Sequence, residues 1–311
     1  MTTSSTLYWA MPSSANSPSY IIDSDNNYDT FQLAREQSLG FFDDISEEHW
    51  KRAQYIHAKV FPNHSPNITT YSNRPQDKKN REALEMSNKW YGQNFHEEFH
   101  CPLSQRLPTS GVADGPKWIC DPHRLKGKKD CLVYSFGSNG NKDFEQGIRD
   151  EVGDNCEIHT FDLYGANPLK GSLSGNFTEI LLGLSTFHQW RLGYSKRKGH
   201  PNRLKSLQRT MKELGHECRR IDILKIDCEW CEWFTYRDWL KADIRQLLVE
   251  THNAPMPNTQ DFFFDLHDAG FVFFSKEANY VNKADRVEYA FLKLSTDFFT
   301  NGTTYRKKSN R

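Results

Sequence analysis

The chain has 311 residues, which is enough for one large domain or two modest ones. It carries 40 Lys and Arg residues against 40 Asp and Glu residues, so its formal charge is zero. Balanced charge argues against a protein held on nucleic acid by bulk electrostatics, and we expect no nucleic-acid partner. No apolar run approaches the roughly 18 residues needed to cross a bilayer, so we expect a soluble chain without a membrane segment.

The composition and hydrophobic pattern of the sequence change along the chain and predict four parts. Residues 1–36 are polar and are expected to be disordered or loosely attached. Residues 37–125 are rich in aromatic side chains and predict an irregular, partly helical extension that packs on the domain after it. Within this extension a helix is expected at 46–60, between a capping Ser46 and Pro62. Residues 126–300 predict an α/β domain, and residues 301–311 are a polar tail.

From residue 130 onward, short apolar runs alternate with segments of helical periodicity. This alternation predicts parallel strands joined by right-handed crossovers, and the short connection before the last strand suits an antiparallel hairpin. We therefore expect a Rossmann-like α/β fold with a seven-stranded, mostly parallel sheet and an antiparallel C-terminal hairpin. The expected strands are 131–136, 157–161, 177–182, 221–226, 244–249, 271–274 and 287–294, and the expected helices are 143–152, 203–214, 230–240 and 261–269.

A glycine turn after the first of these strands predicts a cofactor site, although an ordinary turn would leave the same pattern. Ligands of open α/β sheets bind beyond the carboxyl ends of the strands, and Gly137 and Gly140 let the backbone approach a ligand closely. The next helix offers free N–H groups to a carboxylate or phosphate, while the glycine spacing disfavours a dinucleotide. Asp162, at the end of the second strand, can accept hydrogen bonds from ribose hydroxyls. The expected cofactor-binding residues are Ser135, Gly137, Ser138, Asn139, Gly140, Asp162, Leu163, Gly183, Leu184 and Asp227.

Acidic residues and a histidine follow the next two strands and predict the catalytic crevice. Asp227 and Glu229 follow one strand, and Glu250 and His252 follow its neighbour. We expect Asp227 to position the reactants and His252 to act as general base, with Glu229 and Glu250 in support. A divalent ion held by Asp227 with His252 or Asn253 is the weaker alternative, and no metal is expected. Helix capping by Asp227 beside a polar loop is the purely structural alternative.

The seven cysteines leave the compartment open. An odd number in a chain of this length favours reduced thiols and a cytoplasmic protein. The glycosylation sequons at Asn67, Asn176 and Asn301 favour the secretory pathway instead. Cys228 and Cys231 form a C-x-x-C pair without the second pair that a zinc site needs, so local packing or a disulfide is favoured.

Several of these motifs together resemble the family known as methyltransferase domain 22. The segments that carry the resemblance are 132–140 with Phe144 and Glu145, 158–162, 115–122, 38–43 and Trp90 with Tyr91, so it spans roughly residues 38–299. The segment 223–229, Ile-Leu-Lys-Ile-Asp-Cys-Glu, also resembles a motif of FkbM-type methyltransferases. The resemblance implies a class I fold and S-adenosyl-L-methionine as cofactor. The FkbM-type similarity adds O-methylation of a sugar or natural product by analogy.

We therefore expect an S-adenosyl-L-methionine-dependent methyltransferase that O-methylates a hydroxyl of a small molecule or glycan. The glycine series is reduced to Gly137 and Gly140, which departs from the usual class I pattern. Two alternatives stay open for this reason. One is a catalytically weak module that only binds S-adenosyl-L-methionine, and the other is a different Rossmann-type nucleotide-binding enzyme.

Overall fold

The structure is a computed structural model of the chain and describes residues 89–97, 99, 101, 103–109, 116–163, 183–194, 203–253, 258–279 and 286–294. Several sequence-based predictions lie outside these residues. They are the segments 1–36 and 301–311, the helix at 46–60, the strand at 177–182 and the three sequons.

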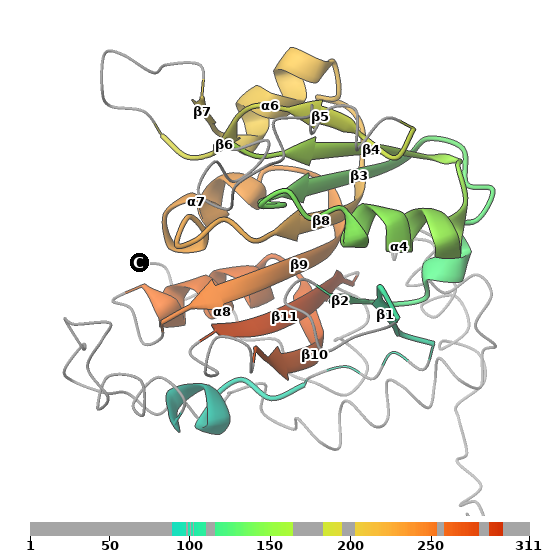
Figure 1. The fold of residues 1–311 in the computed structure, drawn as a ribbon. Coiled ribbons are helices and arrows are strands. Elements are labelled where there is room, and N and C mark those ends of the chain that lie inside the picture. The colour runs from blue at the N-terminus through green and yellow to red at the C-terminus, as the bar shows by residue number, and fades with distance from the viewer. Residues whose placement is uncertain are drawn as a thin grey trace, which may run out of the picture.

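A seven-stranded sheet runs through the centre of the described molecule, in the order β10-β11-β9-β8-β3-β4-β5 (Figure 1). The strands from β9 to β5 are parallel, whereas β11 is antiparallel to both β9 and β10. This arrangement confirms the predicted Rossmann-like α/β fold with its antiparallel C-terminal hairpin. The strands are β3 (Cys131–Phe136), β4 (Cys156–Phe161), β5 (Thr186–His188), β8 (Ile221–Ile226), β9 (Ile244–His252), β10 (Phe271–Ala278) and β11 (Arg286–Lys293).

Strand β9 is longer than its sequence predicts, and this difference matters for the site. The prediction ended the strand at residue 249 and placed the polar residues after it in a loop. In the structure, β11 pairs along β9 as far as His252, and every residue of β9 is buried. Glu250 and His252 are therefore fixed on a buried strand instead of in an open loop.

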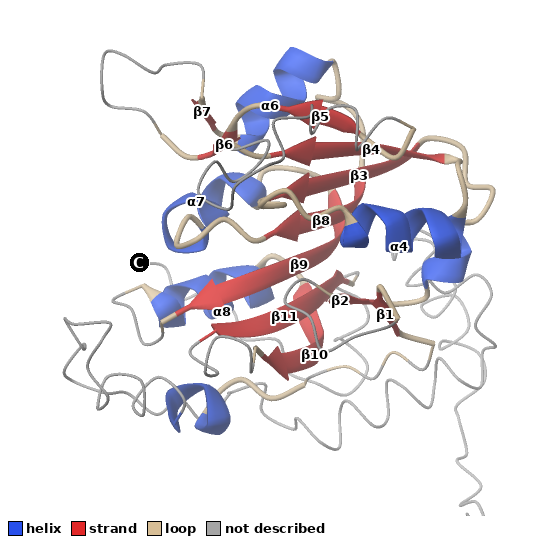
Figure 2. Ribbon diagram, in the orientation of Figure 1, coloured by secondary structure: helices blue, strands red, loops and turns tan. Residues whose placement is uncertain are grey.

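Helices of the described residues cover the two faces of the sheet (Figure 2). Phe144, Ile148 and Val152, on the helix that follows β3, pack on one face with Val133 of β3. The three later helices pack on the opposite face, around aromatic residues such as Trp233 and Phe262. No helix of the described residues is long and apolar enough to span a membrane. The helices are α4 (Asp143–Val152), α6 (Leu207–Leu214), α7 (Glu232–Trp239) and α8 (Thr259–Asp268).

Two helices begin later than predicted, for local reasons. Helix α6 begins after Ser206, whose side chain caps it by accepting a hydrogen bond from the Arg209 amide at 3.1 Å. The residues just before it pair as β7 (Leu204–Lys205) with β6 (Arg191–Leu192). Helix α7 begins at Glu232, because Glu229 and Trp230 have φ angles of 52° and 79°, which a right-handed helix excludes.

The described part of the N-terminal extension packs on the sheet near β9 and β10. It contains β1 (Gln105–Leu107), the antiparallel β2 (Lys117–Ile119) and the short 3-10 helix η1 (Pro122–Leu125). Gln246 of β9 makes two hydrogen bonds to the backbone of Cys120, and Arg106 forms an ion pair of 2.9 Å with Glu277 of β10. Residues 89–93 form a helical turn, after which Phe95 stacks on Phe263 of α8. The predicted boundaries at 36, 125 and 300 stay predictions.

The cysteines correct a sequence-based prediction. Six of the seven form disulfides, Cys101–Cys120, Cys131–Cys156 and Cys228–Cys231, and only the exposed Cys218 is free. The prediction of reduced thiols is therefore wrong. The pairing reflects the fold, since parallel pairing of β3 with β4 brings Cys131 opposite Cys156. For Cys228 and Cys231, the favoured disulfide or local-packing interpretation is confirmed.

Candidate active site

A cavity of about 380 Å³ opens at the carboxyl ends of β3, β4, β8 and β9. This is the edge at which parallel α/β sheets bind ligands. Of the residues expected in the site, eight line the cavity: Gly137, Ser138, Asn139, Asp162, Leu163, Asp227, Glu229 and Glu250. Ser135, Gly140, Gly183, Leu184, His252 and Asn253 do not line it.

Gly137 is the tightest point of the cavity wall. Its φ is +81°, and a Cβ atom there would lie 1.6 Å from the backbone oxygen of Asp227. Its amide donates to Phe161 O at 2.9 Å, and its carbonyl accepts from Lys225 Nζ at 2.6 Å. These contacts join β3, β4 and β8. Only glycine fits this position, because any Cβ atom would clash with the backbone of Asp227.

Asp162 faces the glycine turn from the end of β4. Its Oδ2 accepts a hydrogen bond of 2.7 Å from the Asn139 amide, in the turn where Asn139 and Gly140 both have positive φ. Two buried polar atoms of residues that line the cavity, Ser138 Oγ and Glu145 Oε2, have no hydrogen-bond partner among the described residues. A glycine cradle, an acid across from it and unpaired buried polar atoms fit a polar ligand with several donors and acceptors.

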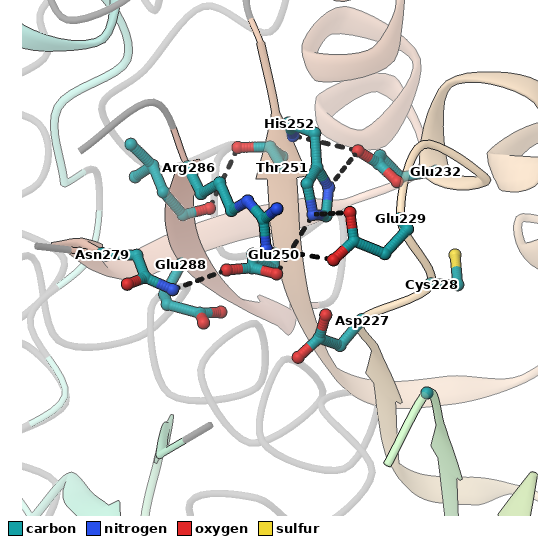
Figure 3. Close-up of polar contacts among 12 residues, drawn as sticks. Asp227, Cys228, Glu229, Glu232, Glu250, Thr251, His252, Asn279, Arg286 and Glu288 are labelled. Atoms are coloured by element: carbon teal, nitrogen blue, oxygen red, sulfur yellow. Dashed lines mark hydrogen bonds and ion pairs between the residues drawn. The ribbon is translucent and has the colours of Figure 1, made fainter. Parts of the chain in front are cut away.

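Beyond the glycine turn, Asp227 and Glu250 place two carboxyl groups side by side (Figure 3). Asn279 Nδ2 donates to Glu250 Oε1 at 2.8 Å, which leaves Glu250 Oε2 3.2 Å from His252 Nε2. Glu229, whose side chain is half exposed, lies 3.0 Å from Arg286 and 3.5 Å from His252 Nε2.

His252 is held from behind by Glu232 of α7. Glu232 Oε1 accepts hydrogen bonds from His252 Nδ1 at 2.8 Å and from its backbone amide at 2.9 Å. The imidazole is fully buried and does not line the cavity, whereas Glu250 does. Carboxylates therefore face both ring nitrogens.

Two buried lysines offset part of the negative charge. Lys117 of β2 lies 2.6 Å from Glu288 Oε1 and 3.5 Å from Asp227 Oδ2, and Lys225 lies 3.8 Å from Asp227. Sequence reasoning missed Lys117, Lys225, Arg286 and Glu288 as members of the site. Lys225 could have been found, because it is two positions before Asp227 on the same strand, where alternate side chains share a face. Lys117 carries no comparable local signal.

These surroundings separate the acidities of the two carboxyl groups. Burial by itself would raise the pKa of Asp227, but Lys117 and Lys225 lower it well below its usual range. Burial and the charge of Asp227 raise the pKa of Glu250 above its usual value. Carboxyl groups whose pKa values are driven apart are typical of acid–base pairs in active sites.

The same surroundings bear on the role predicted for His252. Burial would lower its pKa, but Glu232 and Glu250 outweigh burial and raise the pKa to about 11. Such an imidazole carries both protons at neutral pH and has no lone pair with which to take another. Its absence from the cavity wall and its charge favour a positioning role over that of general base.

The residues that could hold a metal ion differ from the set that the sequence predicted. Ligand atoms of Asp227, Glu250 and His252 lie within 4.8 Å of one another, whereas Asn253 does not belong to this group. Lys117 already supplies a positive charge beside Asp227.

Solved structures with a similar fold are distant in sequence. Fibrillarin from Aeropyrum pernix with natively bound S-adenosyl-L-methionine is 12% identical, with a TM-score of 0.35, over 60% of this chain and 86% of its own. An rRNA methylase from Streptococcus thermophilus is 12% identical, with a TM-score of 0.35, over 56% and 92%. A putative ribosomal RNA methyltransferase from Plasmodium falciparum is 14% identical, with a TM-score of 0.34, over 56% and 91%. No curated protein matches the chain in sequence.

These names overturn one sequence-based prediction. We expected no nucleic-acid partner because the charge is balanced, yet proteins titled fibrillarin and rRNA methylase share the fold. The exclusion is therefore wrong. Net charge describes the whole chain and cannot exclude a local binding surface. At these identities and TM-scores the likeness gives this chain no substrate.

The family comparison covers most of the sequence. The family described as "Methyltransferase domain" matches residues 32–293, which include the glycine turn, Asp162, Asp227 and Glu250. The strand order agrees with the expected Rossmann-like arrangement, while the class I assignment and the FkbM-type similarity stay predictions. The chain belongs to this methyltransferase family.

Proposed function

We propose that this methyltransferase transfers the methyl group to a hydroxyl oxygen, with Glu250 as the proton acceptor. The observation that carries the proposal is the pair of adjoining carboxyl groups in the cavity wall, Asp227 and Glu250, with opposite pKa shifts. A hydroxyl must lose its proton as it attacks. A carboxylate whose pKa is raised above its usual value takes that proton more readily than an ordinary one.

The cavity divides into a donor side and an acceptor side under this proposal. Gly137, Ser138 and Asn139 would hold the methionine part of S-adenosyl-L-methionine, and Asp162 would accept hydrogen bonds from its ribose. The cofactor supplies the methyl group as a sulfonium carbon. Asp227 keeps its negative charge next to Lys117 and Lys225, and this charge would attract the sulfonium.

The remaining residues would hold the acceptor in line with the methyl group. Pro108 and Pro116 of the N-terminal extension line the cavity, so the extension would form part of the acceptor wall. Asn279 contacts Oε1 of Glu250 and His252 contacts Oε2, and the two contacts fix the orientation of the carboxyl group. Methyl transfer needs such alignment, since the attacking and leaving atoms must be collinear with the methyl carbon.

The test is a radiolabelled methyl donor offered with a panel of hydroxyl-bearing acceptors. The panel contains small alcohols and phenols, glycans and RNA, because the ribose of RNA also carries a hydroxyl. Label in a hydroxyl compound that disappears in Glu250→Gln, with S-adenosylhomocysteine affinity retained, supports the proposal. Binding of S-adenosylhomocysteine without turnover on any acceptor indicates the alternative of a module that only binds the cofactor. Loss of label after chelation, restored by magnesium, would assign Asp227 and Glu250 to a metal instead.

We also infer that the chain works in an oxidising compartment. The three disulfides support this, because protein disulfides persist in the secretory pathway and outside cells but are rare in the cytosol. Alkylation of the protein in living cells before lysis, followed by mass spectrometry, tests the inference. Alkylated Cys131 and Cys156 would contradict it.

A further inference from the structure

A group of three histidines lies near β4 and β5, at the end of the strand order that is farthest from β10 (Figure 1). His159 and Glu157 are on β4, His188 is the last residue of β5, and His216 follows α6. None of these residues lines the cofactor cavity. The group is therefore separate from the site described above.

Three ligand atoms of this group converge on one point. His159 Nε2 lies 2.8 Å from Glu157 Oε1, and His216 Nε2 lies 3.4 Å from the same oxygen. All three atoms lie within 4.8 Å of one another. The ligand atoms of a tetrahedral zinc ion, each about 2.0–2.2 Å from the metal, are separated by roughly 3.3 Å. The two separations that involve Glu157, 2.8 and 3.4 Å, lie on either side of this value.

The opposite polar atom of each group is anchored by another side chain. His159 Nδ1 is 2.8 Å from His188 Nε2, and His216 Nδ1 is 2.6 Å from Tyr134 Oη. Arg219 donates a hydrogen bond to Glu157 Oε2. Metal-binding histidines and carboxylates carry this kind of outer partner, which fixes the ring orientation and the tautomer. The three anchors leave Nε2, Nε2 and Oε1 directed toward one another.

We propose that Glu157, His159 and His216 bind a divalent transition-metal ion, Zn²⁺, with water as the fourth ligand. Two imidazoles and one carboxylate suit zinc better than magnesium or calcium, which prefer oxygen ligands. Both histidines are 6% exposed, whereas the Glu157 side chain is 44% exposed, so an ion enters from the side of Glu157. The bound ion joins β4 to the segment after α6 and stabilises this edge of the sheet.

The competing account is a hydrogen-bonded network in which Glu157 accepts a hydrogen bond from each histidine and no ion binds. The two accounts differ in metal stoichiometry. Protein purified without a histidine tag and treated with EDTA is titrated with Zn²⁺ and, in parallel, with Co²⁺, whose visible absorption reports tetrahedral nitrogen and oxygen ligands. We expect one equivalent per chain and a rise in Tm of at least about 3 °C with Zn²⁺ in excess.

Variants assign the ion to these residues. His159→Gln and His216→Gln should each lose the equivalent and the rise in Tm, whereas His96→Gln, at an exposed histidine elsewhere, should keep both. Circular dichroism and S-adenosylhomocysteine binding show whether each variant is folded, and Glu157→Gln provides a third substitution at the exposed ligand. Absence of Zn²⁺ binding by the wild type, or an unchanged equivalent in both histidine variants, would overturn the proposal.

Discussion

The site around His252 and the group at Glu157 lie on the same sheet but differ in the ratio of carboxylates to imidazoles. Around His252, three carboxylates from Glu229, Glu232 and Glu250 face one imidazole. At β4 the single carboxylate of Glu157 faces two imidazoles, those of His159 and His216. Both groups include a histidine on a parallel strand, so position in the fold does not distinguish them.

The proportions explain why the two groups are suited to different chemistry. An imidazole among carboxylates keeps both protons and acts as a buried cation that holds its acidic neighbours. Two imidazoles that share one carboxylate can direct nitrogen lone pairs toward a common point, which is what a metal ion requires. The role of a histidine at a strand end thus depends on the number of carboxylates that face it.

The largest expected effect concerns which group takes the proton. Glu250→Gln should lower the methyl-transfer rate by about 10²–10⁴-fold, the usual contribution of a general base, while S-adenosylhomocysteine affinity stays nearly unchanged. His252→Gln should cost less, because it alters only the position of Glu250. Single-turnover rates with the labelled donor and calorimetric titration measure the two quantities, with Glu217→Gln at an exposed acid as the matched control. If His252→Gln is as slow as Glu250→Gln, the assignment of the base is wrong.

The next effect concerns the cation that the extension contributes to the acidic cluster. Lys117→Met should destabilise the protein by about 3–5 kcal/mol, because it leaves the buried carboxyl of Glu288 without its partner. Replacing both residues, as Lys117→Met with Glu288→Gln, should recover part of the loss. Urea denaturation of the single and double variants gives the coupling energy. A double variant as unstable as the sum of the singles would contradict a direct interaction.

The origin of Lys117 also shows what sequence could not reveal about the site. Asp162, Asp227 and Glu250 could be predicted because each follows or ends an apolar strand whose carboxyl end faces the crevice. Lys117 is separated from Asp227 by 110 residues and comes from a β-ribbon that has no repeating pattern. Its charge enters the site only through packing of the extension on the sheet.

The predicted role of His252 differs from the structure for a similar reason. Apolar periodicity ended the strand at residue 249, so His252 was expected at an open crevice. Pairing of β11 with Arg286 opposite His252 extends the strand and buries the ring. Burial and partners from other strands decide the protonation of a histidine, and neither is encoded in its immediate neighbours. The disulfides within 101–120 and 131–156 also depend on pairing across 19 and 25 residues.

The protonation of His252 can be tested through the pH dependence of stability. Its folded pKa of about 11 lies above the ordinary value of 6.5, so its stabilising contribution is complete below pH 6.5 and is lost as pH rises toward 11. Between pH 7 and pH 9 the wild type should lose up to about 1.4 kcal/mol of unfolding free energy per pH unit more than His252→Gln. Urea denaturation at the two pH values measures this difference. Equal slopes would show that the imidazole is neutral and free to act as base.

A smaller effect is expected on the donor side of the cavity. Asp162→Ala should weaken S-adenosylhomocysteine binding by about 1–3 kcal/mol, the cost of leaving ribose hydroxyls unpaired. The substitution also removes the hydrogen bond to the Asn139 amide, so Asp162→Asn serves as the conservative comparison. Calorimetry at one salt concentration measures both affinities. Unchanged binding in both variants would move the ribose site away from Asp162.

The smallest effect is expected at Glu229, and it separates this residue from Glu250. Glu229 was predicted to support catalysis, and it lines the cavity with an ion pair to Arg286. Its side chain is 55% exposed, and exposed ion pairs contribute about 0–1 kcal/mol because water screens them. Glu229→Gln should therefore change the methyl-transfer rate by no more than about fivefold, since 1 kcal/mol corresponds to that factor. A loss comparable to that of Glu250→Gln would make the exposed carboxylate the base, because only a group that receives the proton directly gives so large an effect.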